Sequence, residues 1–105
     1  MKSRAAAAVF LATIGTASAI EISAQQLHER CSSDTQTSIL ACGSYILGFV
    51  ENERTQTQPR FCVAVETEVS VIAFGFASYY ATTKSMGPAA PALAAFLKRD
   101  YPCKT

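Results

Sequence analysis

The stretch from Cys42 to Val50 is almost wholly apolar, since only Ser44 and the Tyr45 hydroxyl are polar in it. The surrounding pattern predicts a central helix from about Asp34 to Glu51 that is apolar on nearly every side. Such a helix is typical of a position covered by neighbours all round, because an apolar side left in water forgoes the stabilisation of burial. We therefore expect the rest of the fold to pack around this helix.

Two glycines, Gly43 and Gly48, lie inside the predicted central helix. A glycine in a helix interior costs about 1 kcal/mol relative to alanine. We favour the explanation that another helix, or a disulfide, approaches closely at these positions. The alternative is that side-chain size does not matter there.

The residues before the central helix predict one shorter helix. Ser23 and Gln26 have the spacing of a capping box, in which the two side chains bind backbone N–H groups at the helix start. This helix is expected to end near Arg30. Ser33 and Gln36 have the same spacing, so we expect a second capping box before the central helix.

A polar stretch and then an ambiguous one follow the central helix. Glu51–Arg60 is the most polar stretch and predicts an exposed loop. Within Phe61–Tyr80, residues 63–71 alternate as in a strand, whereas the hydrophobic residues of 65–80 also recur at helical spacing. A strand of this length would be unusual in so small a domain, so a helix is favoured and a strand is the alternative.

A break between Thr82 and Pro88 precedes the last element. Pro88 and Pro91 are acceptable in the first turn of a helix, and Pro102 ends it. One apolar stripe follows the helical period: Leu93, Phe96, Leu97 and Tyr101. The sequence therefore predicts an all-α fold, a small bundle of about four helices.

Aromatic residues gather near the end of the third element, at Phe74, Phe76, Tyr79 and Tyr80. They cannot all face one core. We favour packing against the central helix. The alternative is that some of them form a homodimer or partner interface, where Tyr and Phe are enriched.

The first nineteen residues have the features of a cleavable signal peptide. Lys2 and Arg4 precede an apolar run from Ala5 to Gly15, and small residues follow at positions 17–19. The run is shorter than the roughly 20 apolar residues of a membrane span. We expect cleavage after Ala19 and a mature domain, residues 20–105, that does not span a membrane.

Charge and cysteine content narrow the class of protein further. The mature domain has eight acidic and seven basic residues without a basic patch, so nucleic acid is not an expected partner. All four cysteines lie in the mature domain: Cys31, Cys42, Cys62 and Cys103. An even number in a small exported chain predicts two disulfides. No two cysteines have the spacing of a zinc site and His28 is the only histidine, so neither a metal nor another cofactor is expected.

The expected helices suggest how the cysteines pair. If the last two helices are antiparallel across the turn at residues 82–88, Cys62 lies near Cys103. Cys31 and Cys42 then meet across the short connection between the first two helices. Chain-entropy estimates predict that a Cys31–Cys42 disulfide stabilises the fold by roughly 3 kcal/mol, and that a Cys62–Cys103 disulfide, which closes a longer loop, stabilises it by roughly 4 kcal/mol.

The sequence does not suggest catalysis. A nucleophilic Ser or Cys needs a neighbouring base, and His28 is better explained as a surface residue of a short helix. Two carboxylate pairs, Glu51/Glu53 and Glu66/Glu68, have members two residues apart, which point away from each other on a helix. We do not expect an enzyme.

Several short motifs follow one another along the chain. They are Cys31 after the first helix, the stretch from Cys42 to Gly48, Phe61-Cys62, Tyr79-Tyr80 and Tyr101-Pro102-Cys103. In this order and spacing, the chain resembles the Rap/Tai family of immunity proteins of the type VI secretion system. The resemblance covers essentially the whole mature domain. It implies an exported, all-helical, disulfide-bonded homodimer, and a helix for the third element.

The resemblance also implies a function. Such proteins bind a peptidoglycan amidase and occlude its active-site cleft, so we expect a periplasmic or secreted inhibitor without catalytic residues. The loops at residues 51–60 and 82–88 are expected to bind the partner, because polar loops on a rigid scaffold commonly carry specificity. The expected contacts are Glu51, Glu53, Arg54 and Lys84. The alternatives are a small helical periplasmic stress protein that shields unfolded chains, and a structural module of the same fold.

Overall fold

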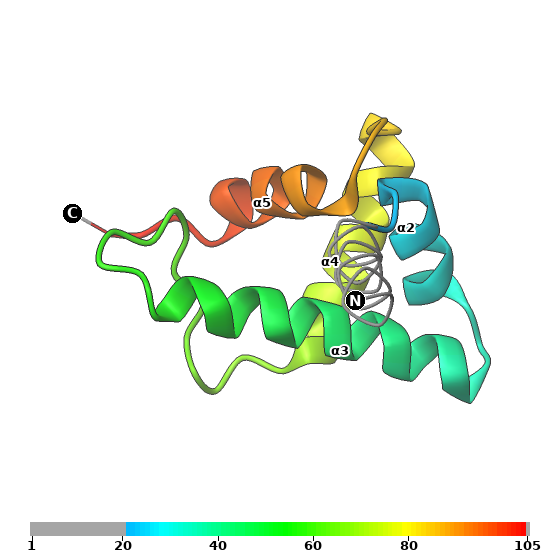
Figure 1. The fold of residues 1–105 in the computed structure, drawn as a ribbon, viewed down its shortest axis with the longest axis horizontal. Coiled ribbons are helices and arrows are strands. Elements are labelled where there is room, and N and C mark those ends of the chain that lie inside the picture. The colour runs from blue at the N-terminus through cyan, green and yellow to red at the C-terminus, as the bar shows by residue number, and fades with distance from the viewer. Residues whose placement is uncertain (1–20, 105) are drawn as a thin grey trace, which may run out of the picture.

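The computed structural model describes residues 21–104, which form four α-helices. They are α2 (Ala24–Ser32), α3 (Gln36–Arg54), α4 (Val69–Thr83) and α5 (Ala89–Asp100). Figure 1 shows the long helix α3 with α5 above it, while α4 crosses behind α3 and α2 lies near the start of α3. The predicted all-α fold is confirmed. The expected signal peptide, residues 1–19, lies outside the described residues.

The two predicted helix starts differ in outcome. At α2, the Ser23 side chain accepts from the Gln26 N–H and the Gln26 side chain accepts from the Ser23 N–H, so the capping box is confirmed. At α3, the N-cap is Thr35, whose hydroxyl accepts from the Ser38 N–H, and the box predicted at Ser33 is wrong. The Ser33 hydroxyl instead accepts from the Thr35 N–H and orients the true cap.

The expected exposed loop is present at residues 55–60, and the favoured helix is present as α4, but the stretch between them departs from both interpretations. Within the described residues, 61–68 form neither a helix nor a strand, and α4 begins only at Val69. Phe61 and Val63 are buried, so this stretch packs as an extended connection. The Arg54 side chain binds the Val63 and Ala64 carbonyls, which a helix would have used internally.

Helix α3 is covered on one side only. Its buried residues are Cys42, Ile46, Val50 and Glu53, which form a single stripe. Helices α2 and α4 make the main helix contacts of α3, and the opposite side of α3 has no helix against it among residues 21–104. The expectation that neighbours would surround the helix is therefore wrong, and Ile39, Leu40 and Leu47 remain about half exposed.

The close approach of two helices occurs at a glycine that the sequence pattern did not single out. A Cβ built on Gly75 in α4 would lie 2.7 Å from Cζ of Phe96 in α5, closer than real contacts allow. The same construction at Gly43 gives an ordinary 3.7 Å contact, and at Gly48 it meets nothing within 4 Å. Close packing was therefore the wrong explanation for Gly43 and Gly48.

Most of the α4 aromatic residues pack against α5 and α2 rather than α3. Phe76 and Tyr79 contact the Phe96 ring at centroid distances of 6.1 and 5.6 Å. Tyr80 stacks on His28 of α2 at 4.6 Å, so His28 is a half-buried packing residue and not the expected surface residue. Phe74 points away from this core and is 77% exposed.

Both predicted disulfides are present. Cys31 pairs with Cys42, and Cys62 pairs with Cys103. The last helix starts with Pro88 as its N-cap and ends at Asp100, close to the predicted limits. The two chain segments before α2 and α5 are joined by backbone bonds, from Ala24 to Gly87 and from Ala89 to Ile22.

Candidate functional site

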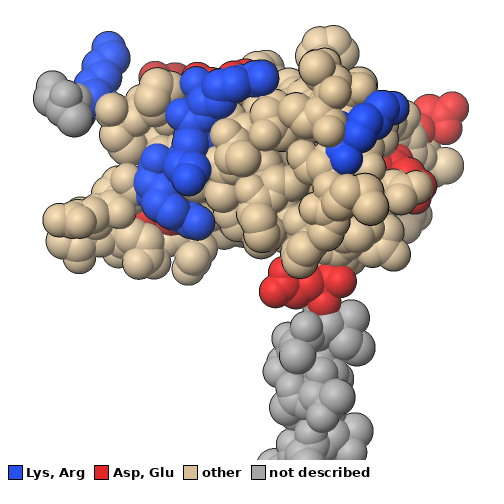
Figure 2. Space-filling model, turned by 90° about the horizontal axis from the view of Figure 1, so that it is seen from above, with Lys and Arg blue, Asp and Glu red and all other residues tan. Residues whose placement is uncertain are grey.

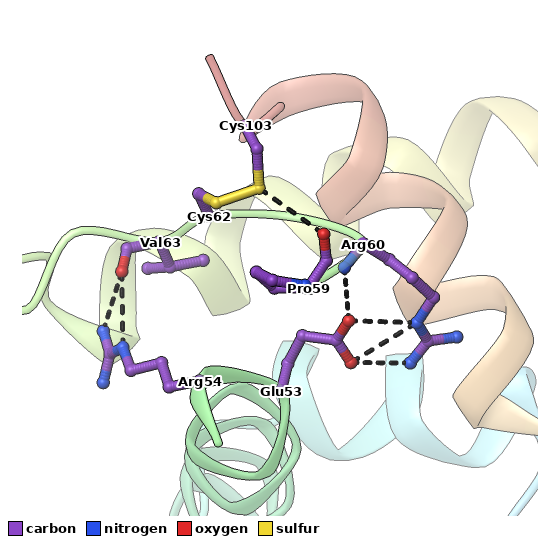
Figure 3. Close-up of a disulfide and its surroundings, with 7 residues drawn as sticks. All are labelled: Glu53, Arg54, Pro59, Arg60, Cys62, Val63 and Cys103. Atoms are coloured by element: carbon purple, nitrogen blue, oxygen red, sulfur yellow. Dashed lines mark hydrogen bonds and ion pairs between the residues drawn. A yellow bond between two sulfur atoms is a disulfide. The ribbon is translucent and has the colours of Figure 1, made fainter. Parts of the chain in front are cut away.

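A polar loop, residues 55–60, follows α3 and is anchored at its base by a buried carboxylate. Glu53 is only 3% exposed, and its oxygens accept hydrogen bonds from the Arg60 backbone N–H and guanidinium. The Arg60 Nη2 lies 2.9 Å from the Glu53 Oε1. Figure 3 shows both groups converging between the end of α3 and the returning chain. The pair therefore joins the two ends of the polar loop.

The environment of this pair keeps both groups charged. The hydrogen bonds from the Arg60 side chain, and then the one from its backbone N–H, lower the pKa of Glu53 against the opposing effect of burial. The bond to Glu53 raises the pKa of Arg60. The guanidinium also lies 5.8 Å from the Phe49 ring centroid and 5.9 Å from that of Phe61, at cation–π range.

Arg54 fastens the chain beyond the polar loop to α3. Its Nη2 donates to the Val63 oxygen at 3.0 Å and to the Ala64 oxygen at 3.1 Å. Its Nη1 pairs with Glu51 at 2.6 Å. These bonds use most of the donors of the guanidinium, so Arg54 holds the extended connection in place.

The Cys62–Cys103 disulfide fastens the same region to the C-terminal segment. Cys62 also donates its backbone N–H to the Tyr101 oxygen at 2.8 Å. The Cys103 Sγ lies 3.7 Å from the Pro59 oxygen, as Figure 3 shows. This is a packing contact, because a disulfide sulfur has no proton to donate. The polar loop is thus anchored by an ion pair, by Arg54 and by a disulfide.

The surface of the polar loop is hydrophilic. An open hollow of about 700 Å³ is lined entirely by polar residues: Asn52, Glu53, Gln56, Thr57, Gln58 and Arg60. Residues 55–58 are exposed and uncharged. Figure 2, seen from the α5 side, shows Lys and Arg side chains in a short band toward the C-terminal end of the molecule and again in a separate group toward the opposite end. Because residues 55–58 carry no charge, the exposed part of the polar loop offers amide and hydroxyl groups to a partner.

A second hollow, which we call the apolar groove, lies at the other end of α3. It has a volume of about 810 Å³ and is lined by residues 31–33 and by parts of α3 and α4. Its most exposed apolar residues are Ile39 (51%), Leu40 (58%), Leu47 (46%) and Phe74 (77%). The aromatic cluster of α4 had suggested an interface, but the contribution of α3 was missed. The apolar surplus around α3 was the signal that could have indicated it.

Three of the four expected partner-binding residues lie together at the end of α3, but in different environments, and Lys84 lies apart at the end of α4. Glu53 lies inside, at the base of the polar loop, because α3 continues to Arg54 rather than ending at Glu51. Glu51 has a half-exposed side chain paired with Arg54. Lys84 is exposed beyond the end of α4, with a left-handed backbone at φ 52°. Whether Glu51, Arg54 and Lys84 contact a partner stays a prediction.

Sequence reasoning missed the structural role of Arg60. It belongs to the expected loop, but no local pattern indicates that it pairs with Glu53, seven residues earlier. The ion pair depends on a turn that brings residue 60 back to the end of α3. The presence of a cation beside the Phe61-Cys62 motif was the nearest signal.

Other kinds of site find little support between residues 21 and 104. In this range no group of three or more His, Cys, Asp or Glu side chains could hold a metal ion. None of its helices is long and apolar enough to cross a membrane. The buried Nδ1 of His28 has no hydrogen-bond partner within the same range, and the ring packs on Tyr80.

Comparisons with known proteins identify the family. Neither the curated proteins nor the solved structures gave a match. A family model, that of the Rap1a immunity proteins, matches residues 23–103. The match includes all four helices, both disulfides and the polar loop. The chain therefore belongs to the Rap1a immunity proteins.

Proposed function

We propose that this protein binds a peptidoglycan amidase, delivered as a secreted effector by a type VI secretion system, and inserts the polar loop into its active-site cleft. Family membership supports an immunity role against an effector. The target and the mode of inhibition come from the resemblance of the sequence motifs. Such an inhibitor excludes substrate by its shape, so it needs no catalytic group of its own.

The anchoring of the polar loop is the observation that carries this proposal. Residues 55–58 are exposed, yet the loop is closed at its base by Glu53 and Arg60 and followed by the Cys62–Cys103 disulfide. A loop held in one shape loses less conformational entropy when it binds. Its amides and hydroxyls can hydrogen-bond to polar groups that line a hydrolase cleft.

The periplasm is the proposed location. Two disulfides fit an oxidising compartment, and a cell-wall amidase acts on the same side of the membrane. Glu51, Arg54 and Lys84 are proposed to contribute at the edge of the contact. Two copies are proposed to act as a homodimer, as the resemblance implies.

The test is binding and inhibition by the oxidised mature chain, residues 20–105, with purified peptidoglycan amidases encoded alongside type VI secretion systems. We expect one of them to bind tightly and to lose hydrolytic activity. The double variant Thr57→Ala/Gln58→Ala should weaken inhibition at least about tenfold, which corresponds to about 1.4 kcal/mol.

Gln25→Ala is the matched control, because Gln25 is an exposed polar residue of α2, far from the polar loop in the chain. It should inhibit like the wild type. If no amidase is bound, the target is wrong. If binding persists unchanged in the double variant, the polar loop is not the inhibitory element.

A further inference from the structure

We propose that the apolar groove is the surface through which two copies of this chain pair, each placing Phe74 against the groove of the other. This rests on the homodimer of the proposed function and assigns it a face. The inference starts from α3, whose apolar residues exceed what α2 and α4 can cover. A surplus of this kind on a small exported domain points to a partner.

The groove has the composition of a permanent contact. None of its lining residues, which come from residues 31–33, α3 and α4, is charged. The cores of homodimer interfaces are likewise depleted of charge and enriched in aromatic residues. In a two-fold pair, residues near the axis face their own copies, and a charge there would repel itself. A neutral face avoids this repulsion.

The exposed area is comparable to that of the largest apolar patch on a typical monomer, a patch that is often functional. The four most exposed apolar side chains leave roughly 400 Å² of surface in water, within the range of functional patches on monomers. A stable interface buries about 800 Å² per partner. The small and polar lining residues around these four side chains supply further area toward that value.

The groove and the side chain that could fill it lie on the same face. Phe74 is 77% exposed and belongs to the lining, so it projects beside the hollow rather than closing it. When a two-fold axis passes between a projection and the hollow beside it, each projection enters the hollow of the other copy. This self-complementarity favours a second copy over an unrelated protein.

The Cys31–Cys42 disulfide helps to form the groove. It ties residues 31–33, at the end of α2, to α3, and both cysteines belong to the lining. Without this bond, the end of α2 could move away from α3 and open one wall. Pairing therefore depends on oxidation of the chain.

Pairing through this face leaves the polar loop accessible. The groove uses residues 39–47 of α3, whereas the polar loop begins after Arg54, at the opposite end of the helix beside the C-terminal segment (Figure 1). Leu47, the groove residue of α3 nearest to the polar loop, precedes Thr55 by eight residues, which is about 12 Å along the helix axis. Each copy of the pair can then present its own loop.

The test is the mass of the oxidised mature chain, measured by sedimentation velocity over a concentration series. The wild type should be a dimer. Phe74→Glu should raise the dimer dissociation constant at least about 100-fold, because it places a carboxylate in the partner's apolar groove. Met86→Glu is the matched control: Met86 is 92% exposed but lies outside the groove, so this variant should stay dimeric.

Leu40→Asp provides a second, independent variant from α3 in case Phe74→Glu does not fold, and circular dichroism checks both. A monomeric wild type, or a Phe74→Glu or Leu40→Asp protein that folds and dimerises normally, overturns the proposal. A monomer that suppresses aggregation of an unfolded protein also overturns it, because the groove is then a chaperone surface. The proposed function is tested by a different measurement. It fails if the wild-type protein binds no amidase, whether the protein is a monomer or a dimer.

Discussion

The two ends of α3 are built on opposite principles. The C-terminal end carries a hollow lined by polar residues, where a buried carboxylate, Glu53, is fully engaged with Arg60. The N-terminal end carries an uncharged apolar groove whose side chains are only half covered. Each end is fastened by its own disulfide. The buried charge at the C-terminal end has its hydrogen-bond partners, whereas the apolar side chains at the N-terminal end remain partly exposed to water.

This difference suggests separate roles for the two ends. A satisfied polar network fixes the shape of a loop before any partner arrives, which favours specific recognition. An unsatisfied apolar surface gains free energy only when something covers it. We therefore assign effector recognition to the polar loop and self-association to the apolar groove. The following predictions test whether the two ends can be disturbed independently.

Removal of either disulfide should have the largest effect. Chain entropy predicts a loss of about 4 kcal/mol for Cys62→Ser/Cys103→Ser and about 3 kcal/mol for Cys31→Ser/Cys42→Ser. The losses differ because the Cys62–Cys103 disulfide joins residues 41 positions apart, whereas the Cys31–Cys42 disulfide joins residues 11 positions apart. Urea unfolding at low temperature measures both losses.

The same two variants should differ in function. At temperatures where each remains folded, Cys62→Ser/Cys103→Ser should keep the dimer but expose the polar loop to proteases. Cys31→Ser/Cys42→Ser should weaken the dimer and leave the polar loop resistant. If both variants lose the dimer equally, the two ends are coupled and the assignment of separate roles is wrong.

Glu53→Gln should have the next largest effect, a loss of about 2 kcal/mol in the free energy of unfolding. The amide cannot accept all the bonds that Arg60 donates, and it turns an N–H₂ group toward the Arg60 donors. Proteolysis at residues 55–60 should accelerate, whereas the dimer mass should not change. Urea unfolding and limited proteolysis measure the two effects.

Glu51→Gln is the control for this variant. Glu51 is a carboxylate on the same helix, but its side chain is 57% exposed and pairs with Arg54 at the surface. The substitution should cost less than about 0.5 kcal/mol. Equal losses for Glu51→Gln and Glu53→Gln would show that burial of Glu53 contributes nothing.

The sequence predicted the elements of the fold better than their surfaces. Helical periodicity and the capping box at Ser23 gave the helices. The assumption of two antiparallel last helices gave the correct cysteine pairing, although Cys62 lies in the connection before α4 rather than at its start. These signals are local, or they follow from the order of the helices. The extended connection at residues 61–68 could not be predicted, because the Arg54 side chain competes there for backbone carbonyls.

The site was predicted less well for a similar reason. The polar loop was recognised by its composition, but the burial of Glu53 depends on Arg60 returning to the end of α3. Hydrophobicity indicated that α3 needed cover, yet it could not say that part of this cover is absent from residues 21–104. A surplus of apolar residues on a helix therefore indicates either a surrounding core or an interface.

Acid should remove part of the stability contributed by the C-terminal end. Arg60 lowers the pKa of Glu53 in the folded chain below the value near 4.3 that it has in the unfolded chain. Its stabilisation is therefore complete above that value and is lost as the pH falls through the folded pKa. The difference in stability between wild type and Glu53→Gln should shrink from about pH 4.3 downward. Urea unfolding across an acid pH series measures this, and a difference that stays constant contradicts the assigned cause.

The smallest effect is expected at Lys84, which lies at neither end of α3. Its backbone is left-handed, with φ 52°, a conformation that costs a lysine more than a glycine. Lys84→Gly should therefore stabilise the fold by roughly 0.5 kcal/mol despite the loss of a side chain. Thermal unfolding measures this gain, and Lys84→Ala, which keeps the strain, is its control. If Lys84→Gly raises stability and both variants weaken amidase inhibition, the lysine side chain contacts the effector and recognition extends beyond the polar loop. If inhibition is unchanged in both, recognition is confined to the C-terminal end of α3, and the contrast between the two ends becomes sharper.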